Sequence, residues 1–213
     1  MYFMKFQLKN AVLTIIIANA VLFLFQAFIG DKFTDLFILD QHYIFSHPWM
    51  YFTSMFLHSG IPHLVLNMLV LFFLGPLLEE TVGSRRFLEI YLGAGIVANL
   101  LSVFFYERAL GASGAVMGVI GVLIILMPNL KVLIYGILPA PLWMVGILYA
   151  ALDIFGVLYP SSVGSIAHLI GMGFGLLFGL YLKKQSGKFH KKIANKQHLD
   201  DEDLDEYLRT GRI

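Results

Sequence analysis

Four polar residues stand in apolar surroundings and are of the types needed for acyl transfer. Ser113 occurs in "LGASGAVMG", His168 in "SIAHLIGMGFG", and His63 and Asn67 in "HSGIPHLVLNM". A serine hydroxyl attacks a carbonyl carbon when an imidazole takes its proton, and N–H donors stabilise the oxyanion that forms. Ser113 is therefore the candidate nucleophile and His168 the candidate general base. His63, Asn67 and the backbone N–H of Ser113 are candidate oxyanion donors.

From the sequence, no carboxylate is expected to be available to orient the base. Asp153 is placed near an outer helix end, and Glu79, Glu80 and Glu89 belong to the cytoplasmic side. We therefore predict a Ser–His dyad without a third member, in which packing holds the imidazole.

Other site chemistries fit less well. No histidine is followed by glutamate, as a His-Glu-x-x-His metalloprotease requires. His58, His63 and His168 could bind zinc, but no cysteine ligand or catalytic carboxylate accompanies them. An intramembrane aspartyl protease needs two acidic residues within its spans, and none is predicted there. We expect no cofactor and no metal. We also expect no nucleic-acid partner, because no basic patch with interleaved aromatics occurs; the net charge of +1 by itself says nothing about nucleic acid.

The composition places these residues in a membrane protein. Of 213 residues, 58% are apolar and 14% are charged, and the mean hydropathy is +0.77. The charge is segregated, because 14 of the 29 acidic and basic residues lie from Lys183 onward. We therefore expect two parts, a membrane domain over residues 1–182 and a charged cytoplasmic tail over residues 183–213. The absence of cysteine excludes disulfides and thiolate metal sites.

Windows without charged residues predict an all-α, polytopic fold with six membrane-spanning helices, since a bilayer core of about 30 Å needs roughly 20 helical residues. The windows are Asn10–Gly30, a segment from about Ile61 to Leu78, Ile90–Tyr106, Ala109–Leu130, Val132–Leu152 and Ile154–Leu182. Pro139 and Pro141 predict a bent fifth helix. The first connection, residues 31–60, is long and aromatic, which favours a position in the headgroup zone.

The basic residues predict that both termini are cytoplasmic. Only Lys32 and Arg108 fall on the outer side of the six-span arrangement. The other basic residues before position 197 fall on the inner side: Lys5, Lys9, Arg85, Arg86, Lys131 and the lysines between 183 and 196.

The fourth helix is predicted to be short. If it begins near Ser113 and stops before Pro128, it is about 22 Å long, less than a core of roughly 30 Å. Non-helical backbone must cross the remainder, which membranes tolerate only where that backbone is buried in protein or faces water. Ser113 is therefore expected at a helix start, below the outer surface and on the floor of a wet cavity.

Two stripes of small residues predict which helices meet. One stripe shares a face with His168, and the other runs along the fourth helix beside Ser113. Their members are Gly171, Gly175 and Gly179 on the sixth helix, and Gly114, Gly118 and Gly121 on the fourth. Small residues let helix backbones approach closely, so docking of these stripes would bring His168 within hydrogen-bond reach of Ser113.

Three motifs resemble those of the rhomboid family of intramembrane serine proteases. They are Gly111-x-Ser113-Gly114, His63-x-x-x-Asn67 with His58 before it, and Ala167-His168-x-x-Gly171. Their order on the second, fourth and sixth spans is also similar, over about residues 10–182. The resemblance implies a Ser113 nucleophile, a His168 base and oxyanion donors at His63 and Asn67. It further implies single-span or other membrane proteins as substrates within the lipid bilayer, a membrane-embedded first loop, and a fifth helix that gates access.

The resemblance has departures, and other functions stay open. Met117 stands one turn after Ser113, where many family members have an aromatic residue against the histidine, and a thioether can pack on a ring edge. The first loop lacks a clear Trp-Arg pair, and Glu79 matches a structural acidic position. One alternative is a non-proteolytic rhomboid-like protein that binds or escorts membrane clients. Another is a six-span transporter, which would show an inverted repeat that the sequence lacks.

Overall fold

The computed structural model describes residues 10–134, 138–159 and 164–194, and most of these residues are helical. Six long helices dominate this part of the chain: α1 (Asn10–Ile29), α4 (Ile61–Val82), α5 (Ser84–Ser102), α6 (Ser113–Leu126), α7 (Leu142–Leu158) and α8 (Ser165–Ala194). Within α1, α4 and α8 there are segments long and apolar enough to cross a membrane, and α6 and α7 are shorter apolar helices.

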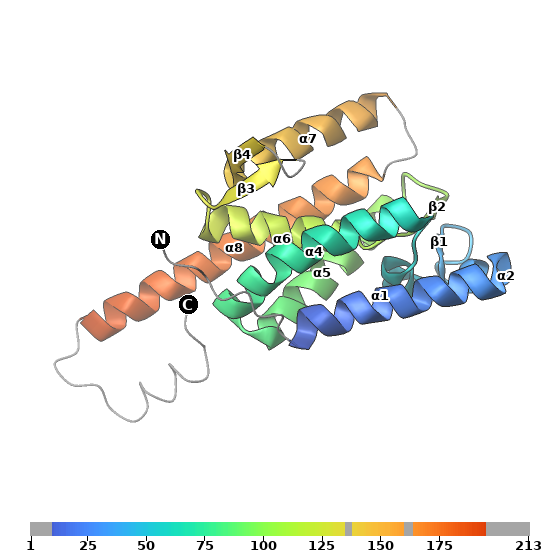
Figure 1. Cartoon of the computed structure of the whole chain (residues 1–213), viewed down its shortest axis with the longest axis horizontal. Helices are drawn as coiled ribbons and strands as arrows, with labels where there is room; N and C mark the ends of the chain where they lie inside the picture. The colour runs from blue at the N-terminus through green and yellow to red at the C-terminus, as the bar shows by residue number, and fades with distance from the viewer. Residues whose placement is uncertain (1–9, 135–137, 160–163, 195–213) are drawn as a thin grey trace.

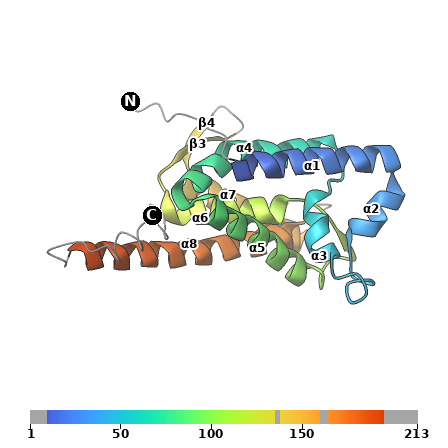
Figure 2. The same ribbon diagram turned by 90° about the horizontal axis from the view of Figure 1, so that it is seen from below.

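Helix α6 lies at the centre of the bundle. It packs against α4, α5, α7 and α8, and the two ribbon views agree on its central position (Figures 1 and 2). All residues from Gly114 to Leu123 are buried. A helix that is apolar on every side is stable only when neighbours surround it. The element that begins at Ser113 is therefore the core of the fold.

The backbones of α6 and α8 touch through glycines. A Cβ atom on Gly171 would lie 2.0 Å from the carbonyl oxygen of Gly114. One on Gly175 would lie 2.1 Å from the carbonyl oxygen of Gly118. Contacts this short are possible only without side chains, so the predicted docking of the two small-residue stripes is confirmed.

The predicted fifth span, Val132–Leu152, is wrong at its start. Residues Lys131–Ile134 (β3) and Leu138–Pro141 (β4) pair as an antiparallel two-stranded sheet, and α7 begins only afterwards. Pro139 and Pro141 explain the difference, because a fixed φ and a missing N–H suit an edge strand better than a helix interior. The two prolines therefore belong to a strand and do not bend a helix.

The predicted boundary between the fifth and sixth spans at Asp153 is also wrong. Helix α7 continues through Asp153, and α8 starts at Ser165 instead of Ile154. The charge of Asp153 was interpreted as the end of a span, but this residue is only 5% exposed. At its other end α8 passes the predicted boundary at Leu182, and residues 195–213 of the predicted tail lie outside the described residues.

The predicted starts at Ile61 and Ser113 agree with the structure, whereas the start of the third span does not. Helix α5 begins at Ser84, six residues before Ile90, so its first turns carry charged side chains. Helix α6 has 14 residues, or about 21 Å, which confirms the short fourth helix starting at Ser113.

The connection between α1 and α4 is structured and presents aromatic side chains. It contains α2 (Asp31–Phe37), β1 (Leu39–Asp40), α3 (Met50–Thr53) and a 3-10 turn, η1 (Ser54–Phe56). Strand β1 pairs with β2 (Arg108–Ala109), which precedes α6. Phe45 is 95% exposed, and Tyr43 and Trp49 are also exposed.

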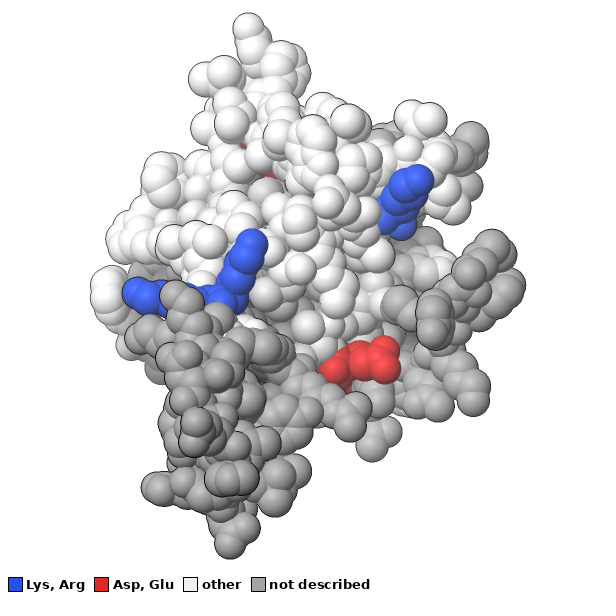
Figure 3. Space-filling model, turned by 90° about the vertical axis from the view of Figure 1, so that its left-hand side faces the viewer, with Lys and Arg blue, Asp and Glu red and all other residues white. Residues whose placement is uncertain are grey.

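Several charged side chains stand at the end of the bundle that Figure 3 faces, where uncharged residues separate them from one another over the described part of the surface. Glu79 is buried there and accepts hydrogen bonds from the backbone N–H groups of Ala11 and Val12 at 3.2 and 3.1 Å, and from the hydroxyl of Ser84. Glu79 therefore joins α1, α4 and α5, in keeping with a structural role.

Candidate active site

Ser113 is the first residue of α6 and is half-buried. The preceding Gly111 has φ 129°, a left-handed conformation that favours glycine. No side chain of the described residues caps this helix end. Since the first N–H groups of a helix lack intrahelical partners, they are available as donors beside the Ser113 hydroxyl.

The His63 ring and the Ser113 hydroxyl both lie close to Gly111. A Cβ atom on Gly111 would lie 2.9 Å from His63 Nε2 and 3.8 Å from Ser113 Oγ. On its other side, His63 Nδ1 accepts the backbone N–H of Ser59 at 3.4 Å and lies 3.0 Å from the Ser59 hydroxyl oxygen. A neutral ring that accepts through Nδ1 carries its proton on Nε2. In this form His63 has an N–H donor at Nε2, the ring nitrogen that lies near Gly111.

Asn67 lies one helical turn after His63 on α4 and is 7% exposed. Its side-chain amide donates one hydrogen bond, at 3.1 Å, to the carbonyl oxygen of His63. That bond is within α4 and does not reach Ser113. Because an amide nitrogen has two protons, Asn67 retains a second donor.

His168 is in the first turn of α8, next to the start of α6. A Cβ atom on Gly114 would lie 3.5 Å from the carbonyl oxygen of Ala167, so the residues adjoining Ser113 and His168 face each other. Met117 is buried within the helix core, and its predicted packing on the His168 ring stays a prediction.

The expectation that no carboxylate is available to the base is wrong. Asp153 Oδ1 lies 2.9 Å from His168 Nδ1, and the two side chains are 7% and 15% exposed. The sequence does contain a feature that indicates this contact, because Asp153 is the one charged residue of α7. A lone acid in an apolar helix needs a partner, and that requirement points to a polar residue on a neighbouring helix.

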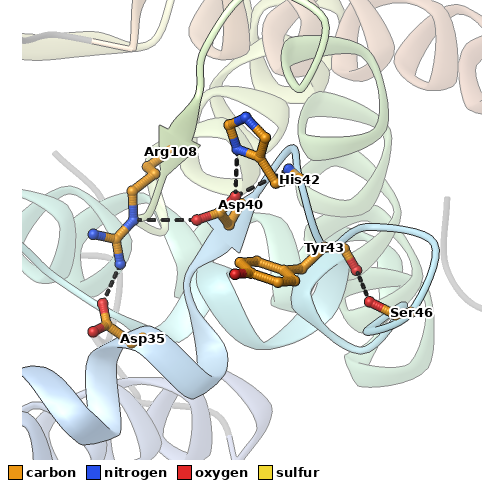
Figure 4. A network of polar contacts seen from close by, with 6 residues as sticks. All are labelled: Asp35, Asp40, His42, Tyr43, Ser46 and Arg108. Carbon is orange, nitrogen blue, oxygen red and sulfur yellow. Dashed lines mark hydrogen bonds and ion pairs between the residues drawn. The ribbon is translucent and has the colours of Figure 1, made fainter.

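Ion pairs and a backbone hydrogen bond hold the loop that precedes Ser113. Arg108 forms ion pairs with Asp35 and with Asp40, the latter at 3.7 Å, and the backbone N–H of His42 donates to Asp40 at 3.0 Å (Figure 4). The Gly111 N–H donates to the carbonyl oxygen of Ser54 at 2.9 Å. The structured first connection therefore holds the backbone immediately before the candidate nucleophile.

His58, in the loop that precedes α4, supports the position of His63. Its ring meets that of His63 edge-on, with centroids 5.0 Å apart, and it is 2% exposed. Neither ring nitrogen has a hydrogen-bond partner among the described residues. Burial, together with the nearby His63, lowers the pKa of His58 from 6.5 to about 4. His58 is therefore neutral at ordinary pH and packs as an aromatic ring.

Comparisons with known proteins identify the family of the chain. The Rhomboid domain matches residues 46–185. Over 188 residues the chain is 30% identical to Rhomboid protein 1, mitochondrial, of Saccharomyces cerevisiae, an alignment that covers 83% of this chain and 54% of that protein. It is 35% identical over 149 residues to Rhomboid protease GluP of Bacillus subtilis, covering 69% of this chain and 29% of that protein. With Putative rhomboid protease YdcA of Bacillus subtilis the identity is 33% over 143 residues, covering 64% and 69%.

The chain belongs to the rhomboid family. It spans about half the length of the yeast relative and less than a third of GluP. Its several apolar helices and its family make it an integral, multi-pass membrane protein.

Proposed function

We propose that this chain is an intramembrane serine endopeptidase that cuts transmembrane segments of membrane proteins near the outer face of the bilayer. The observation that carries the proposal is the glycine contact between α6 and α8, because it sets the beginnings of the two helices, with Ser113 and His168, beside each other. Relatives named rhomboid proteases support the same activity.

The proposed reaction uses Ser113 and His168 as nucleophile and base. Ser113 Oγ attacks the peptide carbonyl carbon while its proton passes to His168 Nε2. The oxyanion accepts hydrogen bonds from the Ser113 N–H, His63 Nε2–H and the Asn67 amide, and one such donor supplies roughly 3–4 kcal/mol of transition-state stabilisation.

The bond to the leaving nitrogen then breaks as that nitrogen takes the proton from the His168 imidazolium, which leaves an acyl ester on Ser113. A water molecule attacks the ester and gives its proton to His168. The ester bond breaks, Ser113 Oγ recovers this proton, and the carboxylic acid product departs.

The proposed topology has six spans, α1, α4, α5, α6, α7 and α8, with both termini in the cytoplasm. The excess of basic residues at one end of the bundle supports this orientation. Since α6 covers about 21 Å of a core of roughly 30 Å, Ser113 lies roughly 5–10 Å beneath the external face.

The depth of Ser113 limits the proposed substrates. A helical peptide bond is shielded by its own hydrogen bonds, and unwinding it in lipid exposes polar groups at a cost of several kcal/mol each. Segments with Gly or Pro near the outer end of a span unwind most easily, so they are the expected substrates. Mass spectrometry of products from a model single-span protein should place the cut in the outer quarter of its span or just outside it. A cut in the cytoplasmic half contradicts the topology.

The activity is tested with detergent-purified protein and a single-span substrate. Ser113→Ala and His168→Ala should each abolish cleavage, and the double variant should lose little more, because the two residues act as one unit. A fluorophosphonate probe should label the wild type and not Ser113→Ala. Stable binding of the substrate without any cleavage by the wild type would favour the non-proteolytic escort function instead.

A further inference from the structure

A buried carboxylate interrupts the apolar sequence of α7. Asp153 is 5% exposed, whereas the adjacent Leu152 and Ile154 are 55% and 53% exposed. Helix α7 therefore turns Asp153 toward the protein interior and its neighbours toward the surroundings. A carboxylate is costly to bury in an apolar environment unless it is paired, so the contact made by Asp153 is decisive for its role.

The contact joins Asp153 to the candidate base through a defined pair of atoms. Asp153 Oδ1 lies 2.9 Å from His168 Nδ1, and Asp153 Oδ2 has no hydrogen-bond partner among the described residues. An ionised carboxylate only accepts hydrogen bonds, so Nδ1 of His168 carries the proton. In the neutral ring Nε2 then has the free lone pair, which is the form that accepts a proton from a serine hydroxyl.

We infer that Asp153 is a positioning residue for His168 and extends the pair to Ser113–His168–Asp153. The inference rests on the proposed protease function. Asp153 holds the imidazole in one tautomer, fixes its rotation, and stabilises the imidazolium that exists between the two proton transfers. Asp153 stays ionised throughout, because the proton from Ser113 travels to Nε2 and on to the leaving nitrogen.

The same contact could stabilise the packing of α7 against α8 without any effect on the base. This structural role and the positioning role have different consequences. The structural role affects the free energy of unfolding, whereas the positioning role affects the chemical step. Asp153→Asn separates them, because it preserves the volume of the side chain and its capacity to hydrogen-bond. It removes the charge, and its NH₂ group donates to Nδ1 and so selects the opposite tautomer of His168.

The test measures kcat, KM and the thermal unfolding midpoint for the wild type and Asp153→Asn in one detergent. We expect kcat to fall about 100- to 10,000-fold, KM to stay the same because Asp153 does not touch substrate, and the midpoint to change little. Leu152→Ala is the matched control, since it alters an exposed neighbour and should keep wild-type kcat. A folded Asp153→Asn protein with wild-type kcat overturns the inference.

A measurement that does not use Asp153→Asn covers the case in which that variant fails to fold. Nitrogen-15 NMR, with the His168 signals assigned by their loss in His168→Gln, reports which ring nitrogen is protonated. A neutral ring protonated on Nδ1 supports the inference, and one protonated on Nε2 overturns it. Failure of the protease function itself looks different, because the wild type would then neither cleave the substrate nor react with the fluorophosphonate at Ser113.

Discussion

Replacing Gly171 by alanine tests whether backbone contact between α6 and α8 holds the candidate site together. The added Cβ would lie 2.0 Å from the carbonyl oxygen of Gly114 and 2.8 Å from its carbonyl carbon. Both atoms are backbone atoms and cannot rotate away. Since ordinary contact begins at about 3.4 Å, α8 must move away from α6 by about 1.4 Å in a tightly packed core.

This movement acts directly on the proposed nucleophile and base. Ser113 adjoins Gly114, and His168 lies one turn before Gly171, so the two side chains separate with the helices. A misplacement of about 1 Å can cost about 100-fold in rate, and overpacking costs about 1–3 kcal/mol. We expect Gly171→Ala to show both losses, and Gly171→Val to show larger ones.

Gly173→Ala is the matched control on the same helix. Nothing lies within 4 Å of a Cβ atom at Gly173, so turnover should stay at the wild-type value and stability should hold or rise. The assays are turnover of a single-span substrate and thermal unfolding in the same detergent. Wild-type turnover and stability in Gly171→Ala would refute the reasoning, as would equal losses in the two variants.

Three further perturbations test other parts of the structure. Asn67→Ala should lower turnover about 100- to 1,000-fold with an unchanged unfolding midpoint, and unchanged turnover in both Asn67→Ala and His63→Ala would remove the oxyanion role. Glu79→Gln weakens charged hydrogen bonds at the start of α1, so the free energy of unfolding should fall by about 1–3 kcal/mol, whereas the exposed Glu80→Gln should match the wild type. The pKa of His58 is about 4 in the fold and 6.5 when unfolded, so thermal stability should decline as pH falls from 6.5 toward 4. His58→Phe should show a smaller decline, and an identical pH dependence in both proteins would count against the buried neutral ring.

Sequence patterns predicted the parts of the fold that are determined by short stretches of the sequence. The helix start at Ile61 follows from a charge-free window, and the start at Ser113 follows from the helix-weakening glycines around it. The docking of α6 on α8 follows from two glycine stripes, because only small residues permit backbone contact.

The wrong predictions concern residues whose partners lie outside their own segment. An isolated charge is costly in a membrane and therefore predicts the end of a span at Asp153, but His168 on α8 offsets that cost. The apolar run continues through Pro139 and Pro141 and therefore predicts a bent helix. Instead, they lie in β4, which pairs with residues 131–134 of β3 as an antiparallel two-stranded sheet.

The order of α6 and α8 along the chain has a consequence for biosynthesis. Helix α6 is too short to cross the bilayer comfortably alone, and every residue from Gly114 to Leu123 is covered by neighbours in the finished fold. Ser113 leaves the ribosome more than 50 residues ahead of His168. During translation the chain therefore carries the proposed nucleophile without its base until α8 inserts and its glycines meet those of α6. Under the proposed mechanism, newly made protein cannot cut neighbouring membrane proteins in the translocon before the later helix docks.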